Sequence, residues 1–309
     1  MIAGICPHLW QTWKSTLFEL LIHARRFPVK TIMITGGTSG LGQALARTYL
    51  ERGDRVVVVS RSAGKGEAYL RQAEKDGHGG RAFFIEADLS LVNENQRVVE
   101  KVKSDFPVVD ALVLCARFFR SYRRVTSEGI EHHLALFYLS RYLLSHGLAE
   151  CLEKAPEPVV VNVAGPGNHM VRIHWDDLEL ERGYDGWDAM LQGGRLNDLL
   201  GVHFDTEHQE RGIHYVLLFP GNIAGGFVGE FDPVMTVRAE EMRRAGAPIQ
   251  GGVRLVSALI DSPPSETLSA FQERRPINVQ GGSTFDSDDA KRLHDITQDL
   301  IQRAGRGAP

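Results

Sequence analysis

The chain has 309 residues, of which 43% are hydrophobic, and a formal net charge of −4. This composition supplies enough apolar residues for a sizeable core, and the charge excludes the overall basic field by which proteins attract nucleic acid. The three cysteines, Cys6, Cys115 and Cys151, are far apart and odd in number, so we expect neither a disulfide framework nor a cysteine metal site. A reducing, cytoplasmic setting is the expectation.

Residues 1–29 predict a helical arm ahead of the main domain. Apolar residues recur at helical spacing, but Lys14 and Glu19 interrupt them, so the segment does not span a bilayer. It also lacks the cleavage signature of a signal peptide. We expect the arm to pack on the body of the protein or on a second subunit. The alternative is peripheral contact with a membrane, which Arg25 and Arg26 would favour.

From residue 30 onward, strand-like and helix-like segments alternate. Buried apolar runs predict strands at 31–35, 55–60, 82–87, 111–116, 158–164 and 214–219. Helical patterns separate them at 40–53, 93–103, 128–154 and 191–211. The alternation predicts an α/β fold with a single Rossmann-type, doubly wound parallel sheet and helices on both faces. No linker or repeat divides residues 30–309, so we expect one domain.

The first predicted strand runs into a glycine-rich stretch, TGGTSGLG, at residues 35–42. Such glycines permit a tight turn and let the backbone approach a pyrophosphate, while the following helix directs free N–H groups at that anion. Strand, glycine turn and helix together therefore predict a dinucleotide site. Its contacts would come from Gly36, Thr38, Ser39, Gly40, Leu41 and Gly42.

The end of the second predicted strand indicates which dinucleotide binds. A site that prefers NAD usually has a carboxylate there, which holds the 2′-hydroxyl of the ribose. This chain has Ser60 followed by Arg61, and a guanidinium suits a 2′-phosphate. We therefore expect NADP(H) rather than NAD(H). Asp88 and Leu89, just past the third strand, would lie beside the adenine ring.

These motifs resemble those of the short-chain dehydrogenase/reductase family, nearest its retinol-dehydrogenase-like branch. The resemblance covers roughly residues 30–226, through segments such as TGGTSGLG, SRSAGKGEA, ADLS and RGIHYVLLFPGNI. It implies that Pro220 and Gly221 border the nicotinamide and that the backbone near Ile223 meets its carboxamide. By the same resemblance, Cys115 and Ala116 contact the cofactor.

Members of this family move protons with an Asn-Ser-Tyr-Lys tetrad, and the resemblance places other residues at all four positions. These are Phe137, Gly165, Met190 and Gly194. A register one residue later would put Leu191 and Arg195 at the last two positions, which restores a cation but no acid. Because general acid–base catalysis contributes about 10²–10⁴-fold to a rate, we expect ordinary carbonyl reduction to be lost.

Three functions remain open. The first is a non-redox enzyme of natural-product biosynthesis, a cyclase, isomerase or pericyclase that holds an apolar or aromatic substrate in a reactive conformation. The second is an NADPH-dependent reductase of an iminium or an enone, which needs no tyrosine acid. The third is a non-catalytic NADP(H)-binding partner or regulatory subunit. We favour the first, because Phe137 and Met190 would make the catalytic corner apolar.

Candidate residues for substrate contact come from several segments, and they are Arg117, Arg120, Asn168, His169 and Met190. Among them His169 is a candidate proton donor near neutral pH. Asp188 is a candidate displaced acid. An exposed loop histidine, a helix-start aspartate and a solvated basic loop at 116–124 are the simpler interpretations of these residues. The remaining histidines, including His132 and His133, lack a third partner at metal-ligand spacing, so we expect no metal.

Residues 227–309 are expected to cap the substrate. The segment 232–248 predicts a lid helix and the segment 285–305 a C-terminal helix. That last helix would have Ser287 or Asp288 as its N-cap, and one apolar face formed by Leu293, Ile296 and Leu300. A homodimer or tetramer is open, since many members of the family pair through their fourth and fifth helices.

Overall fold

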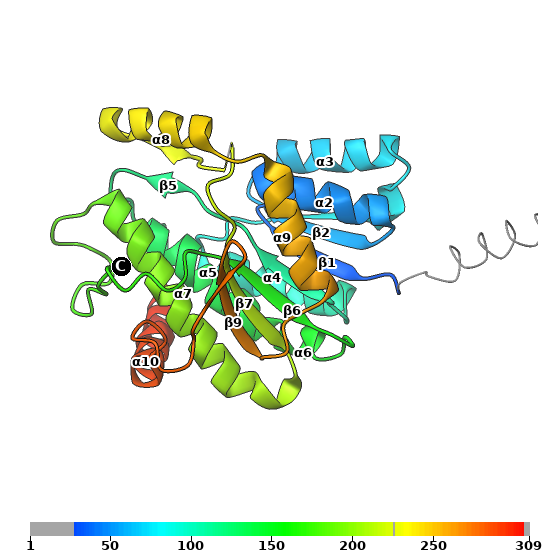
Figure 1. The fold of residues 1–309 in the computed structure, drawn as a ribbon. Coiled ribbons are helices and arrows are strands. Elements are labelled where there is room, and N and C mark those ends of the chain that lie inside the picture. The colour runs from blue at the N-terminus through cyan, green and yellow to red at the C-terminus, as the bar shows by residue number, and fades with distance from the viewer. Residues whose placement is uncertain (1–27, 225, 306–309) are drawn as a thin grey trace, which may run out of the picture. The chain divides into compact units, whose positions relative to one another are not determined.

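The computed structural model describes residues 28–224 and 226–305. From Thr31 onward the chain forms one compact unit, in which an eight-stranded sheet carries helices on both faces (Figure 1). The predicted arm at 1–29, with its proposed membrane contact, lies outside the described residues apart from Pro28 and Val29. Within the described residues, no helix has both the length and the apolar composition needed to cross a bilayer.

Six strands of the sheet follow the predicted apolar runs. They are β1 (Thr31–Thr35), β2 (Arg55–Ser60), β3 (Ala82–Glu86), β4 (Ala111–Leu114), β6 (Val159–Val163) and β7 (His214–Phe219). They pair in parallel in the order β7-β6-β4-β1-β2-β3. β1, β2 and β7 have the predicted bounds, and the other three end one or two residues inside them.

The sheet continues past β7 through two strands that the sequence did not predict. β9 (Leu268–Gln272) pairs in parallel with β7, and β10 (Arg275–Ile277) pairs antiparallel with β9. Two further short strands, β5 (Phe119–Arg120) and β8 (Gly229–Glu230), form a separate parallel pair. This pair connects the segment after β4 with the segment after β7.

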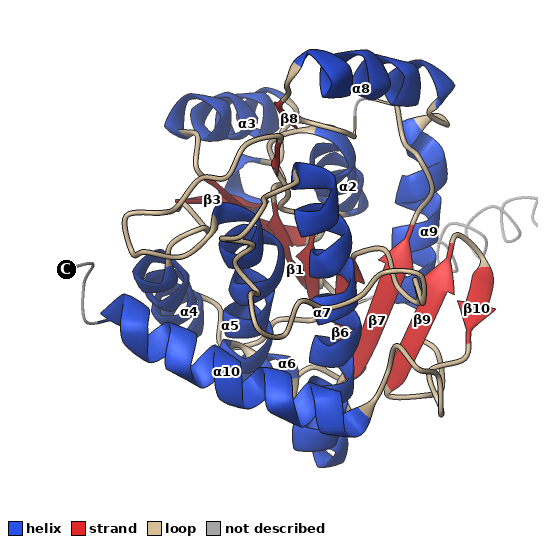
Figure 2. Cartoon of the chain, turned by 90° about the vertical axis from the view of Figure 1, so that its left-hand side faces the viewer, coloured by secondary structure: helices blue, strands red, loops and turns tan. Residues whose placement is uncertain are grey.

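Helices cover both faces of the sheet (Figure 2). One face carries α2 (Gly40–Arg52), α3 (Ala63–Lys75) and α9 (Ile249–Asp261), and the other carries α4 (Val92–Asp105), α5 (Ser140–Gly147) and α7 (Gly186–His208). Side chains alternate between the two cores along each strand, as in β1, where Met33 faces one core and Ile32 and Ile34 the other. The doubly wound α/β fold is confirmed.

The predicted helix at 128–154 is divided into three pieces. A π-helical turn at Leu134–Leu139 precedes α5, and a short helix, α6 (Ala149–Leu152), follows it. Short 3₁₀ turns occur at Gly79–Arg81 and Gln209–Arg211. The helix predicted at 191–211 begins earlier, at Gly186, because the carboxylate of Asp185 accepts hydrogen bonds from the first backbone N–H groups.

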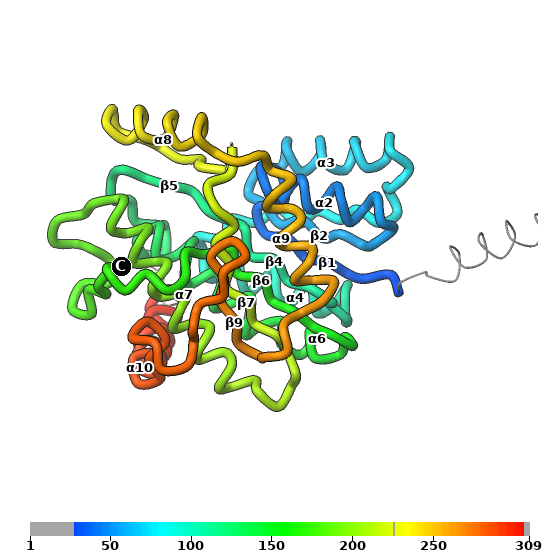
Figure 3. The backbone as a smooth tube through the Cα atoms, viewed as in Figure 1, coloured from blue at the N-terminus to red at the C-terminus, as the bar shows by residue number. Residues whose placement is uncertain are grey.

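The C-terminal segment supplies two predicted helices, α8 (Pro233–Ala245) and α10 (Ser287–Gly305). Figure 3 shows the backbone of α8 beside that of β5. Met235 of α8 and Phe119 of β5 belong to the same buried apolar cluster. The predicted cap of α10 was wrong: the carboxylate of Asp286 accepts the N–H groups of Asp288 and Asp289, both at 2.9 Å. The predicted apolar face is confirmed, because Leu293 and Leu300 are buried and Ile296 packs against them.

Candidate active site

The carboxyl ends of the parallel strands border a cavity of about 910 Å³. Ligands of open α/β sheets bind at this edge, where the direction of the strand order reverses around the first strand. The volume is within the range of about 300–1,000 Å³ that small-molecule and cofactor sites occupy. The cavity is therefore the candidate active site.

Every residue that the sequence predicted to contact the cofactor lines this cavity. The set comprises Gly36, Thr38, Ser39, Gly40, Leu41, Gly42, Ser60, Arg61, Asp88, Leu89, Cys115, Ala116, Pro220, Gly221 and Ile223. These residues come from five separate segments of the chain. The fold brings them together because each segment follows one strand of the parallel sheet.

The glycine turn after β1 has the geometry of a phosphate cradle. Gly36 has a φ of +70°, and a Cβ atom there would lie 3.0 Å from the Ala116 Cα atom. A Cβ atom at Gly42 would lie 2.7 Å from the carbonyl oxygen of Gly36, so both positions require glycine. No side chain caps α2 at Ser39, which leaves the first N–H groups of the helix available to an anion.

The end of β2 carries positive charge and no carboxylate. Ser60 bonds through its hydroxyl to that of Thr38 at 2.9 Å, and the guanidinium of Arg61 lies 4.5 Å from the centre of the Phe118 ring. Lys65, in the first turn of α3, lines the same part of the cavity. Sequence reasoning missed this lysine, although the segment SRSAGK contains it. Two cations beside a neutral serine suit the 2′-phosphate of NADP(H).

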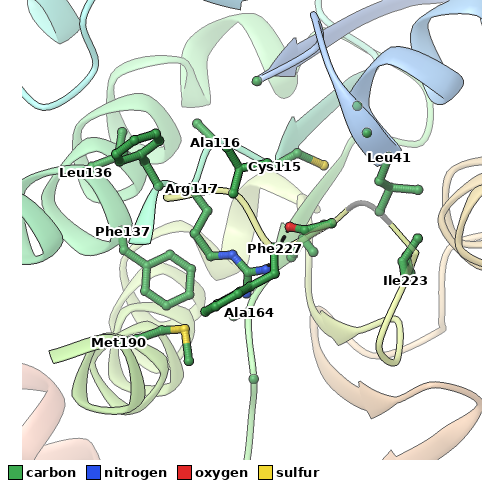
Figure 4. A pocket seen from close by; sticks show the side chains of 18 of the residues that line it. Leu41, Cys115, Ala116, Arg117, Leu136, Phe137, Ala164, Met190, Ile223 and Phe227 are labelled. Carbon is green, nitrogen blue, oxygen red and sulfur yellow. Dashed lines mark hydrogen bonds between the residues drawn. The ribbon is translucent and has the colours of Figure 1, made fainter. Parts of the chain in front are cut away.

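All four positions assigned to the tetrad line the other end of the cavity, with Phe137, Gly165, Met190 and Gly194. Phe137 lies in the π-helical turn, and Figure 4 shows its ring and the Met190 side chain next to each other. A Cβ atom at Gly194 would lie 3.3 Å from the carbonyl oxygen of Gly165. The absence of a side chain at residue 194 therefore lets α7 pack close to the loop after β6.

Arg117 carries a positive charge into this apolar corner (Figure 4). Its guanidinium donates a hydrogen bond to the carbonyl oxygen of Gly226 at 3.1 Å and lies 5.5 Å from the centre of the Phe227 ring. Desolvation by the surrounding protein lowers the pKa of the guanidinium from its ordinary value. Arginine side chains are not deprotonated in proteins near neutral pH, so the group carries a positive charge.

A second cation lies beneath the corner. Arg141 is fully buried and donates to the side-chain oxygen of Asn162 and, at 2.9 Å, to the carbonyl oxygen of Val163. Its guanidinium lies 4.3 Å from the centre of the Phe137 ring. Burial lowers the pKa of Arg141 to about 9, so this arginine is also charged at neutral pH. The corner therefore stabilises negative charge better than its apolar surface suggests.

Few groups of this cavity can transfer a proton at neutral pH. Among the described lining residues there is no tyrosine, and His169 supplies the one imidazole. Burial raises the pKa of the Cys115 thiol to about 12, which makes it a weak acid. Asn168 lines the cavity beside His169, on the exposed loop after β6. Asp188 is exposed in the first turn of α7 and does not line the cavity.

Two arginines considered for the site lie elsewhere. Arg120 pairs with Glu230 next to the two short strands, and its side chain does not line the cavity, so the proposed substrate contact finds no support. Arg195, the cation of the alternative register, pairs with Asp198 at 3.1 Å and also lies outside the cavity lining. The register that assigns Gly194 to the lysine position therefore agrees better with the cavity than the slipped one.

The C-terminal segment contributes residues that sequence reasoning did not identify. Arg238, Met242 and Arg243 of α8 line the cavity, as do Trp187 and Phe227. The guanidinium of Arg238 lies 4.1 Å from the centre of the Trp187 ring. Their placement depends on how α8 packs, which no local pattern specifies. Residues of α8 and of the segment before it therefore border the cavity, and the capping of a substrate by this segment stays a prediction.

Comparisons with known proteins agree with this architecture. The sequence pattern of a family described as short chain dehydrogenase matches residues 30–176. The short-chain dehydrogenase/reductase prx1 of Penicillium rubens is 25% identical over 294 residues, which cover 88% of this chain and 85% of that protein. Retinol dehydrogenase 11 of Mus musculus is 24% identical over 198 residues, covering 64% of this chain and 63% of that protein.

A solved structure shares the fold at lower sequence identity. It is a short chain dehydrogenase from Burkholderia cenocepacia J2315 in complex with NADP, with a TM-score of 0.60 and 18% identity over 79% of this chain and 95% of that chain. Its likeness shows the arrangement of the sheet and helices. The matched sequence pattern over residues 30–176 and these sequence relatives identify this chain as a member of the short-chain dehydrogenase/reductase family.

Proposed function

We propose that this protein binds NADP(H) and acts on an apolar or aromatic small molecule without the proton relay of a tyrosine and a lysine. The observation that carries the proposal is the composition of one cavity. Its dinucleotide end has a free helix N-terminus and two cations, and its other end has Phe137, Met190 and Arg117. Such a site can orient an apolar substrate and stabilise negative charge on it.

The residues at the dinucleotide end fit NADP(H). The turn around Gly36 and the start of α2 would hold the pyrophosphate, and Arg61 with Lys65 would hold the 2′-phosphate. Pro220 and Gly221 would border the nicotinamide. When bound, the reduced cofactor would supply a hydride.

The first candidate reaction is a non-redox isomerisation or cyclisation, including the pericyclic type, in natural-product biosynthesis. In such a reaction Phe137 and Met190 hold the substrate in a reactive conformation, and Arg117 stabilises an oxyanion or enolate as it develops. No group with a pKa near 7 needs to stand at the tyrosine position. The positive charge of the corner supports this candidate.

The second candidate is the reduction of an enone, and Arg117 favours it specifically. An enone that accepts a hydride at its β-carbon becomes an enolate, whose oxygen a guanidinium can stabilise until water protonates the carbon. Reduction of an iminium, the other acceptor considered, is disfavoured by charge. Outside the residues assigned to the cofactor, the described cavity lining includes Arg117, Arg238 and Arg243 and no acidic residue, so it would repel a cationic substrate.

The test is cofactor binding followed by turnover with matched acceptors. NADPH is first titrated into the purified full-length chain, and cyclic enones and the corresponding saturated ketones are then compared. Conversion of a substrate without consumption of NADPH supports the non-redox enzyme. Consumption with enones but not ketones supports the reductase. Tight NADPH binding with neither outcome indicates a non-catalytic partner, and rapid reduction of ketones would contradict the proposed loss of the proton relay.

A further inference from the structure

A cluster of imidazoles and one carboxylate lies away from the candidate active site, between α5 and the C-terminal half of α7. His146 comes from α5, and His203 and Glu207 stand one helical turn apart on α7. One nitrogen from each ring and one carboxylate oxygen all lie within 4.8 Å of one another. None of the three residues lines the cavity, so the cluster serves neither cofactor nor substrate there.

The distances between the nitrogen and oxygen atoms of this cluster are close to the distances between the ligand atoms of a metal site. The Glu207 Oε2 atom lies 3.1 Å from His146 Nδ1 and 3.6 Å from His203 Nδ1. Ligands that bind a tetrahedral zinc ion at about 2.0–2.1 Å are about 3.3 Å from one another. Small rotations of these side chains would therefore place all three ligand atoms around one ion.

The hydrogen bonds present do not satisfy the cluster. The Nε2 atom of His146, the Nδ1 atom of His203 and the Nδ1 atom of His208 are buried without a hydrogen-bond partner. His208 also directs its Nε2 atom at His146 Nδ1, at 3.0 Å. Of these three atoms, His203 Nδ1 is the one that faces the Glu207 carboxylate, at 3.6 Å, and it has no hydrogen-bond partner among the described residues. Buried polar atoms normally have a partner, so this nitrogen beside a carboxylate and a second imidazole points to a missing ligand.

Neighbouring residues hold one of the rings in place. The imidazole of His294 on α10 stacks on His203, with 4.0 Å between ring centres, and the Tyr142 hydroxyl bonds to His294 Nδ1 at 2.9 Å. Outer contacts of this kind orient metal ligands in known sites. They also extend the cluster to α10, which contacts the proposed ligands through the stacked His294 ring.

We propose that His146, His203 and Glu207 bind a zinc ion, with a water molecule or His208 in the fourth position. Two imidazoles and a carboxylate form a common zinc ligand set. The ion would fasten α5 to α7 beneath α10. Sequence reasoning expected no metal, because His146 is distant along the chain and only the packing of α5 against α7 brings it to the other ligands.

The experiment measures zinc binding by the full-length chain, prepared without a histidine tag and stripped with a chelator. Zinc is titrated in competition with a chromogenic chelator, and cobalt is substituted to record its visible absorption. We expect one zinc ion per chain and the intense absorption of tetrahedral cobalt. Replacing a residue that only orients a metal ligand typically lowers metal affinity by about 10–100-fold. Replacing a ligand itself, in His203→Gln or Glu207→Gln, should therefore lower the affinity for zinc at least as much.

Matched controls separate this site from adventitious binding. His174→Gln and Glu210→Gln change exposed residues of the same types outside the cluster, and they should bind zinc as the unmodified chain does. NADPH titration of each variant reports whether it is folded. Failure to retain stoichiometric zinc, or equal affinity in the cluster variants and the controls, would overturn the proposal.

Discussion

The guanidinium of Arg117 lies 5.5 Å from the centre of the Phe227 ring, so a residue that follows β4 meets the segment leading to α8. This contact places a positive charge between the cofactor end of the cavity and its apolar corner. According to the resemblance, members of the family move protons in this corner with the tetrad that this chain lacks. Under the proposed function, the chemistry of this site would depend on charge stabilisation by Arg117.

The first prediction is that Arg117→Met lowers turnover of an accepted enone or isomerisation substrate by about 10²–10³-fold, the usual cost of removing one group that stabilises a developing oxyanion. NADPH affinity should change little, because the phosphate-binding residues are untouched. Steady-state kinetics and a cofactor titration provide the two measurements. Arg124→Met, an exposed arginine in the same basic segment, serves as control, and equal activity of the two variants would rule out the proposed role.

The second prediction concerns cofactor choice. Arg61→Ala should raise the dissociation constant of NADPH by about 10–100-fold, because a hydrogen bond to a charged group contributes about 1.5–3 kcal/mol. The affinity for NADH should stay the same, since NADH has no 2′-phosphate. Fluorescence titrations with both cofactors measure the ratio. Arg71→Ala on α3 is the control, because Arg71 is exposed and, among the described residues, pairs with Glu67. A parallel loss for both cofactors would contradict the assignment.

The parallel core of the fold could be predicted from the sequence because strands buried on both faces are continuous apolar runs. β2 is an example, with four consecutive fully buried valines, Val56 to Val59. β9 was missed because its residues Leu268–Gln272 mix polar and apolar side chains near the edge of the sheet. The π-helical turn at Leu134–Leu139 could not be predicted, because its residues are all apolar or aromatic and show no pattern that differs from an ordinary buried helix.

The sequence predicted those parts of the candidate site in which a local motif fixes the backbone conformation. It did not predict the residues that reach the site only through the packing of distant elements. The turn at Gly36 belongs to the first kind, because its positive φ requires glycine whatever surrounds it. Arg238 belongs to the second, because α8 reaches the cavity only through contacts with distant residues such as Phe119. The zinc cluster is also of the second kind, since His146 and His203 meet only where α5 packs on α7.

The third prediction concerns a variant in which the tyrosine and the lysine of the tetrad are restored. The variant Met190→Tyr/Gly194→Lys should reduce ketones with NADPH at least about tenfold faster than its control, because a general acid contributes about 10²–10⁴-fold when well positioned. The new lysine Cβ atom would lie 3.3 Å from the Gly165 carbonyl oxygen, so a slight shift of that loop should accommodate it. The control is Met190→Phe/Gly194→Ala, which adds bulk without an acid or an amine. Equal rates in both variants would mean that another feature prevents ketone reduction.

The fourth prediction is a loss of stability on acidification through His132. Burial and the charge of Arg120 lower the pKa of His132 to about 4, from an ordinary value of 6.5. In the unfolded chain this histidine takes up a proton as the pH falls below 6.5, whereas in the folded protein it does so only near 4. Its contribution to stability is therefore complete above pH 6.5 and decreases as the pH falls toward 4.

Between pH 7 and pH 5 the linkage at His132 should cost about 2 kcal/mol of unfolding free energy. Urea unfolding at both pH values measures this difference, and His132→Gln should show a correspondingly smaller loss. His174→Gln removes an exposed histidine and should behave as the unmodified chain does. The same pH dependence in His132→Gln and the unmodified chain would exclude this residue as the cause.

The fifth prediction follows from the position of α10. This helix packs on α7 and α4, and its Thr297 bonds to the Tyr138 hydroxyl at 2.6 Å (Figure 2). It therefore covers part of the helical face that the resemblance implies is used for pairing in the family. Dimerisation through that face would require α10 to leave and to expose Leu293 and Leu300. We therefore expect the full-length chain to sediment as a monomer at micromolar concentration.

Leu300→Asp should weaken the packing of α10 and increase self-association, whereas Asp299→Asn, at the neighbouring position, should not. A stable dimer of the unmodified chain that Leu300→Asp leaves unaffected would show that pairing uses another surface and that α10 does not control it.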